Sequence, residues 1–150
     1  MNQKFNDIDA VITELYAVIS GPAGQERDWD RERNLFFPGA KLIRTSIDDT
    51  GKPQALAMDM ASYIENVNDY LVQNGFFEYE IARKTEIFGN VAHVFSTYEA
   101  KHRAEDAEPF KRGINSIQLF FDGERWWIIN MIWDNERPGN PMPERYLESN

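Results

Sequence analysis

The chain has 150 residues, 42% of them hydrophobic and 13% aromatic, which predicts one folded domain over residues 1–150 with room for a core and a cavity. Its 16 basic and 25 acidic residues give a net charge of −9, which repels phosphate backbones and excludes nucleic acid as a partner. The absence of cysteine excludes disulfides, and no stretch approaches the roughly 20 apolar residues needed to cross a bilayer. The N-terminal residues are too charged for a signal peptide, so we expect a cytoplasmic protein without a membrane partner.

The first half of the chain carries mainly helical patterns. Apolar residues at helical spacing, Asp28 as a cap, and breaks at Pro22, Pro38 and Gly75 define its segments. The predicted elements are helices over residues 8–19, 29–37 and 60–71, a strand over 41–47, and an exposed turn over 48–53.

The second half switches to strands bounded by turn residues. The predicted strands cover residues 76–87, 91–103, 113–121 and 126–135. The last two flank Asp122-Gly123, a dipeptide typical of tight hairpins. The run from Trp126 to Trp133 is almost continuously apolar, so both faces of this strand require cover. The protein's own helices can cover one face, and we expect a second copy to cover the other, as a homodimer through the outer sheet face.

Helices followed by antiparallel strands predict an α+β fold. We expect three N-terminal helices packed in the concave face of a curved, mostly antiparallel sheet. The tail over residues 137–150 is expected to run extended over the surface, anchored by Tyr146 and Leu147.

The order of elements and several short segments resemble the nuclear transport factor 2-like superfamily, and within it the bacterial SnoaL-like proteins of unassigned function. The segments that carry the likeness include Arg27-Asp28-Trp29, Asn74-Gly75-Phe76-Phe77-Glu78, Ala92-His93-Val94-Phe95-Ser96-Thr97-Tyr98-Glu99 and Trp133-Asp134. The resemblance implies a cystatin-like cone fold over a single domain. It does not imply one activity, because this fold hosts isomerases, dehydratases, cyclases, hydrolases and binding modules.

Two functions therefore stay open. The first is binding of a small, largely apolar molecule in an internal pocket, with lyase or isomerase chemistry by acid–base catalysis. The second is a non-catalytic binding or dimerisation module. A perturbed titratable group deep in an open pocket would favour the first.

The predicted second helix places Trp29, Arg33 and Phe36 on one side. Arg33 either binds a ligand carboxylate or carbonyl, or forms a salt bridge to Asp28, Glu99 or Asp134. The predicted pocket wall comprises Trp29, Phe36, Tyr63, Tyr98, Asn115 and Trp133.

Polar residues on apolar strand faces are the other candidates, because a buried polar group requires a hydrogen bond. Asn115, Asn130 and Asp134 have this pattern and are pocket candidates, although an ordinary core or interface hydrogen bond explains such residues more often. The cone-fold resemblance implies a buried acid, often with a tyrosine. We take Asp134 as the first candidate for the catalytic base and Tyr98 as hydrogen-bond donor.

The two histidines offer little for a metal site. His93 and His102 have no metal-ligand spacing, and no nucleotide fingerprint is present, so neither metal nor organic cofactor is expected. Each histidine has either a structural or a functional role. His102 shares a strand face with Tyr98 and Ser96 and is the catalytic candidate of the two.

Overall fold

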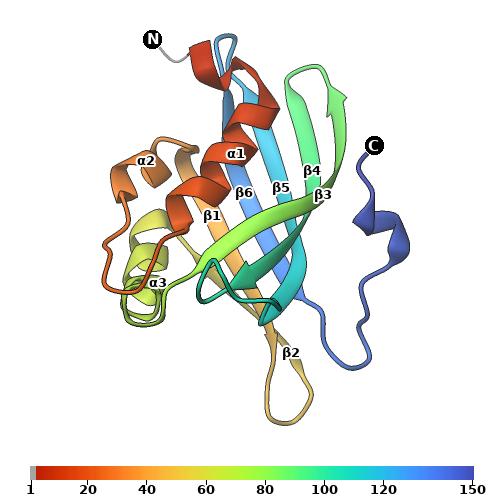
Figure 1. Ribbon diagram of the computed structural model, residues 1–150. Coiled ribbons are helices and arrows are strands. Elements are labelled where there is room, and N and C mark those ends of the chain that lie inside the picture. The colour runs from red at the N-terminus through yellow and green to blue at the C-terminus, as the bar shows by residue number, and fades with distance from the viewer. Residues whose placement is uncertain (1–2) are drawn as a thin grey trace.

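The computed structural model describes residues 3–150 and is an α+β fold (Figure 1). The elements in chain order are η1 (Gln3–Asn6), α1 (Ile8–Ile19), α2 (Trp29–Arg33), β1 (Phe36–Ile47), β2 (Pro53–Met58), α3 (Met60–Asn74), β3 (Phe77–Phe88), β4 (Val91–Lys101), β5 (Lys111–Phe121), β6 (Trp126–Asn135) and η2 (Glu144–Leu147). Helices α1 to α3 lie against one face of a curved, open sheet, which confirms the predicted architecture (Figure 1).

The six strands have the order β2-β1-β6-β5-β4-β3. All neighbours are antiparallel except β1 and β6, which are parallel. The core lies between the inner face of the sheet and the apolar stripe of α1, where Val11, Ile12, Leu42, Val94 and Ile117 are completely buried. Burial of such side chains is the main force that holds helix and sheet together.

Helix α2 is shorter than predicted, because β1 already begins at Phe36. Pro38 and Gly39 lie inside this strand, where the register with β6 shifts between Phe36 and Lys41. β2 pairs with β1 only from Leu42 onward, so the missing N–H of Pro38 interrupts no ladder with β2. Trp29 and Arg33 therefore lie on α2 but Phe36 lies on β1, so the three residues do not share one side of a helix as predicted.

Strand β2 was not predicted. Five of its six residues are exposed, so they lack the alternation that marks a half-buried strand. The preceding turn is as expected: the side chain of Asp48 accepts hydrogen bonds from the backbone N–H groups of Thr50 and Lys52, at 2.8 and 2.9 Å. This hairpin forms one edge of the sheet.

Two bulges change which side chains face inward. Ile128 pairs with Leu119 and Asn130 with Gln118, which leaves Ile129 as an extra residue in β6. Ile81 is the corresponding extra residue in β3. An extra residue reverses the alternation of faces beyond it, so Trp126 and Ile128 are inward before the bulge whereas Met131 and Trp133 are inward after it.

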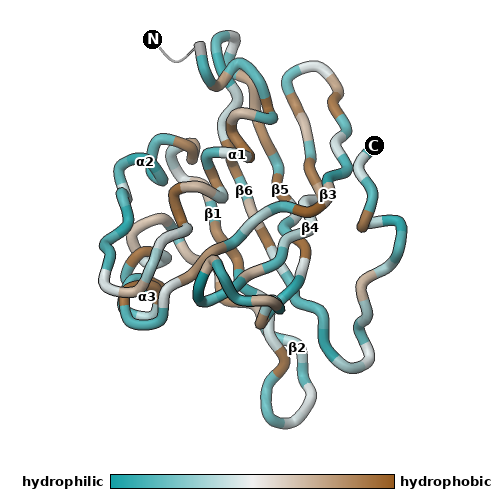
Figure 2. Tube along the Cα trace, viewed as in Figure 1, coloured by the Kyte–Doolittle hydropathy of each residue, from teal (hydrophilic) through white to brown (hydrophobic). Residues whose placement is uncertain are grey.

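The C-terminal segment crosses the outer face of the sheet and is mostly hydrophilic (Figures 1 and 2). The hydroxyl of Thr97 donates to the carbonyl of Tyr146 at 2.6 Å, and the Tyr146 ring packs against Phe95 with centroids 5.1 Å apart. Ser149 and Asn150 then hydrogen-bond to the backbone of β3. The segment is thus fastened to the sheet at two places.

Candidate functional site

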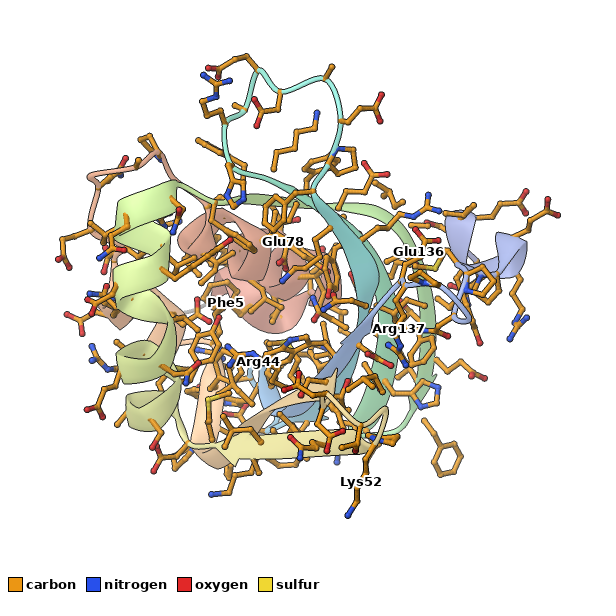
Figure 3. All side chains as sticks on the ribbon, turned by 90° about the horizontal axis from the view of Figure 1, so that it is seen from below. Phe5, Arg44, Lys52, Glu78, Glu136 and Arg137 are labelled. Carbon is orange, nitrogen blue, oxygen red and sulfur yellow. The ribbon has the colours of Figure 1, made fainter. Side chains whose placement is uncertain are left out.

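A cavity of about 490 Å³ lies between the three helices and the concave face of the sheet. Its wall comprises Leu15, Ile19, Glu32, Arg44, Tyr63, Asn66, Val67, Tyr70, Leu71, Phe76, Glu78, Tyr98, Phe110, Lys111, Asn115, Met131 and Trp133. Most of this wall is aliphatic or aromatic, but two carboxyl groups and two cations face the same space. Figure 3 looks into this region and shows Glu78 and Arg44 on opposite sides of the space between α3 and the strands.

Glu32 reaches the cavity from α2. The side chain of Asp28 caps this helix by accepting from the N–H of Arg31 at 3.3 Å. Glu32 faces inward from the helix and is only 1% exposed. Its Oε2 has no hydrogen-bond partner among residues 3–150. Burial, assisted by the charge of Glu78, raises the pKa of Glu32 to about 8. Glu32 is therefore mainly a neutral acid at pH 7, able to donate a hydrogen bond.

Glu78 reaches the cavity from the start of β3, just after Gly75 caps the end of α3. Burial raises its pKa to about 7, although the charge of Lys111 and a hydrogen bond from Asn115 act in the opposite direction. Near neutral pH the group is present in both protonation states. It therefore meets the requirement for a general base, whose pKa should lie close to the working pH.

A network of hydrogen-bonded polar side chains leads from Glu78 to Glu80. Asn115 donates through Nδ2 to Oε1 of Glu78 at 3.5 Å and to the Tyr16 hydroxyl at 3.1 Å. That hydroxyl lies 2.6 Å from Oγ of Ser96, which in turn donates to Glu80. Because every buried side chain of this network has a hydrogen-bond partner, the network fixes the orientation of Asn115.

Tyr98 lies deep in the wall, 1% exposed. Its hydroxyl donates to Oδ1 of Asn135 at 2.5 Å, and burial raises its pKa. Gly113 is opposite Tyr98 on β5, and a Cβ there would lie 2.5 Å from the Tyr98 hydroxyl and 2.4 Å from the Asp134 carbonyl oxygen. Glycine at this position leaves room for the Tyr98–Asn135 hydrogen bond.

Four predicted pocket residues lie in the wall of this one cavity: Tyr63, Tyr98, Asn115 and Trp133. Trp29 and Phe36 do not line it. Trp29 packs edge-on against Tyr63, with centroids 6.4 Å apart, and its indole N–H donates to Oδ1 of Asn68. Phe36 is part of the buried core.

The remaining predicted site residues lie elsewhere. Arg33 is on the exposed side of α2 and pairs with Asp30 at 2.7 Å. Asp134 is on the outer face, because the bulge at Ile129 reverses the alternation of β6, and it pairs with Arg137 at 2.7 Å. Burial opposes ionisation of Asp134, but hydrogen bonds from Arg137 and the Asn135 backbone outweigh it and lower its pKa.

The two histidines also lie outside the cavity wall. His102 has Nδ1 3.2 Å from the carbonyl oxygen of Gly75, and its ring stacks on Phe110 at 3.8 Å. His93 is exposed on β4, 3.0 Å from Glu86. Only His102 adjoins the cavity, through Phe110.

Sequence reasoning missed Glu32, Glu78, Arg44 and Lys111 as site residues. The signal for Glu78 was its place in Phe76-Phe77-Glu78, where it shares a face with the apolar Phe76. For Glu32 the signal was the spacing of three from Trp29 and from Leu35, which puts an acid on the inward side of the helix. Residues 3–150 contain no group of three His, Asp or Glu side chains arranged to hold a metal ion.

No family model matches the sequence, and no curated protein sequence matches it. Solved structures do match. A Nostoc punctiforme protein of unknown function with a cystatin-like fold has a TM-score of 0.65 at 10% identity, over 86% of this chain and 88% of that one. A candidate ketosteroid isomerase from Shewanella frigidimarina has a TM-score of 0.54 at 15% identity, over 83% and 91%.

A third match is the CaMKII hub of S. rosetta, with a TM-score of 0.58 at 17% identity, over 86% of this chain and 94% of that one. These likenesses, together with others to nuclear transport factor 2-like proteins of unknown function, identify the fold of this chain as nuclear transport factor 2-like. The helices that the structure describes include none long and apolar enough to span a membrane.

Proposed function

We propose that the protein binds a small, largely apolar molecule in this cavity and moves a proton on it by cofactor-independent acid–base catalysis of the lyase or isomerase type. One observation carries the proposal: two carboxyl groups, Glu32 and Glu78, face one mostly apolar cavity, and the buried Glu32 has an oxygen without a hydrogen-bond partner in the described part of the chain. A buried unpaired acid is costly to stability, so its presence at a cavity is typical of function.

The two acids suit different roles. Glu78, with a pKa of about 7, removes a proton from a carbon next to a carbonyl group and returns it to another carbon of the same molecule. Glu32, with a pKa of about 8, stays protonated and donates a hydrogen bond to the carbonyl oxygen as negative charge develops there. We assign the base to Glu78 in place of Asp134, which pairs with Arg137 outside the cavity.

The aromatic wall positions the substrate. Tyr63 packs edge-on between Trp29 and Trp133, at centroid distances of 6.4 and 6.3 Å, which gives a rigid apolar surface. Tyr98 extends this surface, and its hydroxyl is already engaged by Asn135. The wall thus selects an apolar body and leaves proton transfer to the carboxyl groups.

The test uses a bicyclic ketone, 2-tetralone, dissolved in D₂O. Proton NMR then measures how fast deuterium replaces the protons next to the carbonyl, which requires no knowledge of the natural substrate. We expect the protein to accelerate exchange, Glu78→Gln to abolish the acceleration and Glu32→Gln to reduce it about 100-fold or more. Asp134→Asn is the matched control and should exchange at the unchanged rate; equal exchange by Glu78→Gln would refute the proposal.

A second candidate, a non-catalytic association module, is favoured by the outer sheet face. Phe37, Val91 and Ile129 are 39%, 62% and 39% exposed there, and the Phe37 ring packs on Phe120 and Trp127. The structural likeness to a protein named as a hub points the same way. We propose a homodimer through this face, which is compatible with a working cavity on the other.

Light scattering after size exclusion tests the dimer. The wild-type chain should elute with twice the monomer mass at micromolar concentration, and Ile129→Lys should elute as a monomer. A protein that dimerises but neither binds apolar ligands nor accelerates exchange would be an association module without chemistry.

A further inference from the structure

Two cations in the cavity wall, Lys111 and Arg44, form no direct ion pair within residues 3–150, although Lys111 is close enough to Glu78 for the two charges to interact. Lys111 comes from the start of β5, where its Nζ lies 5.4 Å from the centre of the Phe76 ring. Arg44 comes from β1 and donates from Nη1 to the neutral side chain of Asn66 at 2.7 Å. Neither forms an ion pair with a carboxylate among residues 3–150, whereas most other arginines of the chain do.

The sheet register explains how both cations reach one space. Glu78 pairs with Ala100, and Ala100 pairs with Lys111, so only a methyl group separates the acid from the lysine across β4. On the other side, Asn115 pairs with Trp133, and Trp133 pairs with Arg44. The two long side chains therefore flank Asn115 on the inner face. Burial lowers the pKa of Lys111, the charge of Glu78 opposes this, and the charge of Arg44 adds to it.

The cavity has an unbalanced charge at neutral pH. Arg44 carries one positive charge and Lys111 a second, while Glu32 is mainly neutral and Glu78 is about half ionised. A single negative charge on a ligand would come close to balancing the site.

We propose that the ligand of this cavity is a small organic monocarboxylate, with its carboxylate bound by Lys111 and Arg44 and its apolar body against Tyr63, Trp133 and Phe76. This inference rests on the proposed function, because it names the substrate class of the same cavity. The acids that move the proton and the cations that bind the carboxylate are then separate parts of one wall. A substrate with a keto or unsaturated group a few bonds from its carboxylate could reach the acids with the first group and the cations with the second.

The test compares two probes of the same shape, 2-naphthoate and its neutral counterpart 2-naphthalenemethanol, by titration calorimetry at low ionic strength. We expect the wild-type chain to bind the carboxylate at least about tenfold more tightly than the alcohol. Lys111→Met and Arg44→Met should each weaken carboxylate binding about tenfold and leave alcohol binding unchanged. Arg44→Lys retains the charge and should recover most of the loss.

Lys101→Met is the matched control, since Lys101 is on the neighbouring strand but lies over Tyr79, away from the cavity wall. It should bind both probes as the wild type does. Equal affinity of the wild type for both probes, or undiminished carboxylate binding by both methionine variants, would overturn the inference but leave the proposed function standing. If neither probe binds, the inference fails together with the proposal of an apolar ligand, and exchange on neutral 2-tetralone then decides independently whether the catalytic part survives.

Discussion

Glu78 on β3 adds its charge to the effect of burial in raising the pKa of Glu32 on α2, so the two acids of the cavity are electrostatically coupled. The helix and the strand are far apart in sequence and are brought together by the packing of α1 and α2 over the concave face. Coupling of this kind separates the two protonation equilibria, which is the condition for one group to act as base while the other remains an acid.

Carbon-13 NMR of the glutamate carboxyl groups should detect this coupling directly. Two resonances should titrate near pH 7 and pH 8, whereas ordinary glutamates titrate near 4.5. Glu78→Gln removes the neighbouring charge and should lower the pKa of Glu32. An unchanged midpoint for Glu32 in that variant would show that burial alone sets its pKa.

The same two groups should make the protein less stable as the pH rises. Their pKa values in the folded state, about 8 and about 7, lie above the ordinary 4.5, so between these limits the unfolded chain releases protons that the folded chain retains. Each group should therefore lower the free energy of unfolding by up to about 1.4 kcal/mol per pH unit, starting near pH 4.5 and ending near its folded pKa.

Urea unfolding at several pH values measures this decline. Glu32→Gln removes one of the two groups, so its stability should fall less steeply and should stop falling near pH 7. Asp134→Asn is a suitable control, because the pKa of Asp134 is lowered and its contribution changes only in the acid range. Identical slopes in wild type and Glu32→Gln would contradict the assignment.

Gly113 and Tyr98 should be sensitive to substitution to different degrees. Tyr98→Phe removes the hydrogen bond to Asn135 and should lower the free energy of unfolding by about 1 kcal/mol. Gly113→Ala places a Cβ at clashing distance from the Asp134 carbonyl and the Tyr98 hydroxyl, and should cost about 1–3 kcal/mol. The double variant lacks the clash with the hydroxyl. Its loss in the free energy of unfolding should therefore be smaller than the sum of the losses in the two single variants.

Removal of residues 144–150 should increase self-association. This segment covers Phe95 and Thr97 on the outer face and pairs with the backbone of Arg83 and Thr85 on β3. Its loss exposes apolar surface and unpaired edge groups together. Light scattering should show species larger than a dimer, whereas Glu148→Ala, at an exposed position of the same segment, should not.

Much of the fold could be predicted from the sequence, because the patterns that determine it are local. The periodicity of α1, the caps at Asp28 and Gly75, and the turn at Asp122-Gly123 all lie where they were expected. Strand β2 escaped detection because it is an exposed edge strand, which lacks the alternation of apolar and polar residues that marks a half-buried strand.

The site was less predictable, because it depends on register. Counting alternate residues from Trp126 places Asp134 inward, and only the extra residue at Ile129 turns it out and turns Trp133 in. A bulge is specified by pairing with neighbouring strands, which a single strand sequence does not reveal. On α2 the error was smaller, because Glu32, which faces the core, is adjacent to the predicted Arg33.

The C-terminal segment also makes the two edges of the sheet differ in how far they are open to another strand. The side chains of Ser149 and Asn150 accept hydrogen bonds from the backbone of Arg83 and Thr85 at the β3 edge. The β2 edge, by contrast, pairs only with β1 within residues 3–150. A strand from another molecule can therefore add beside β2 without displacing anything, but beside β3 it must first detach the tail. Contact between two β2 edges occupies the open edge of both molecules, so strand addition at β2 should by itself end at pairs.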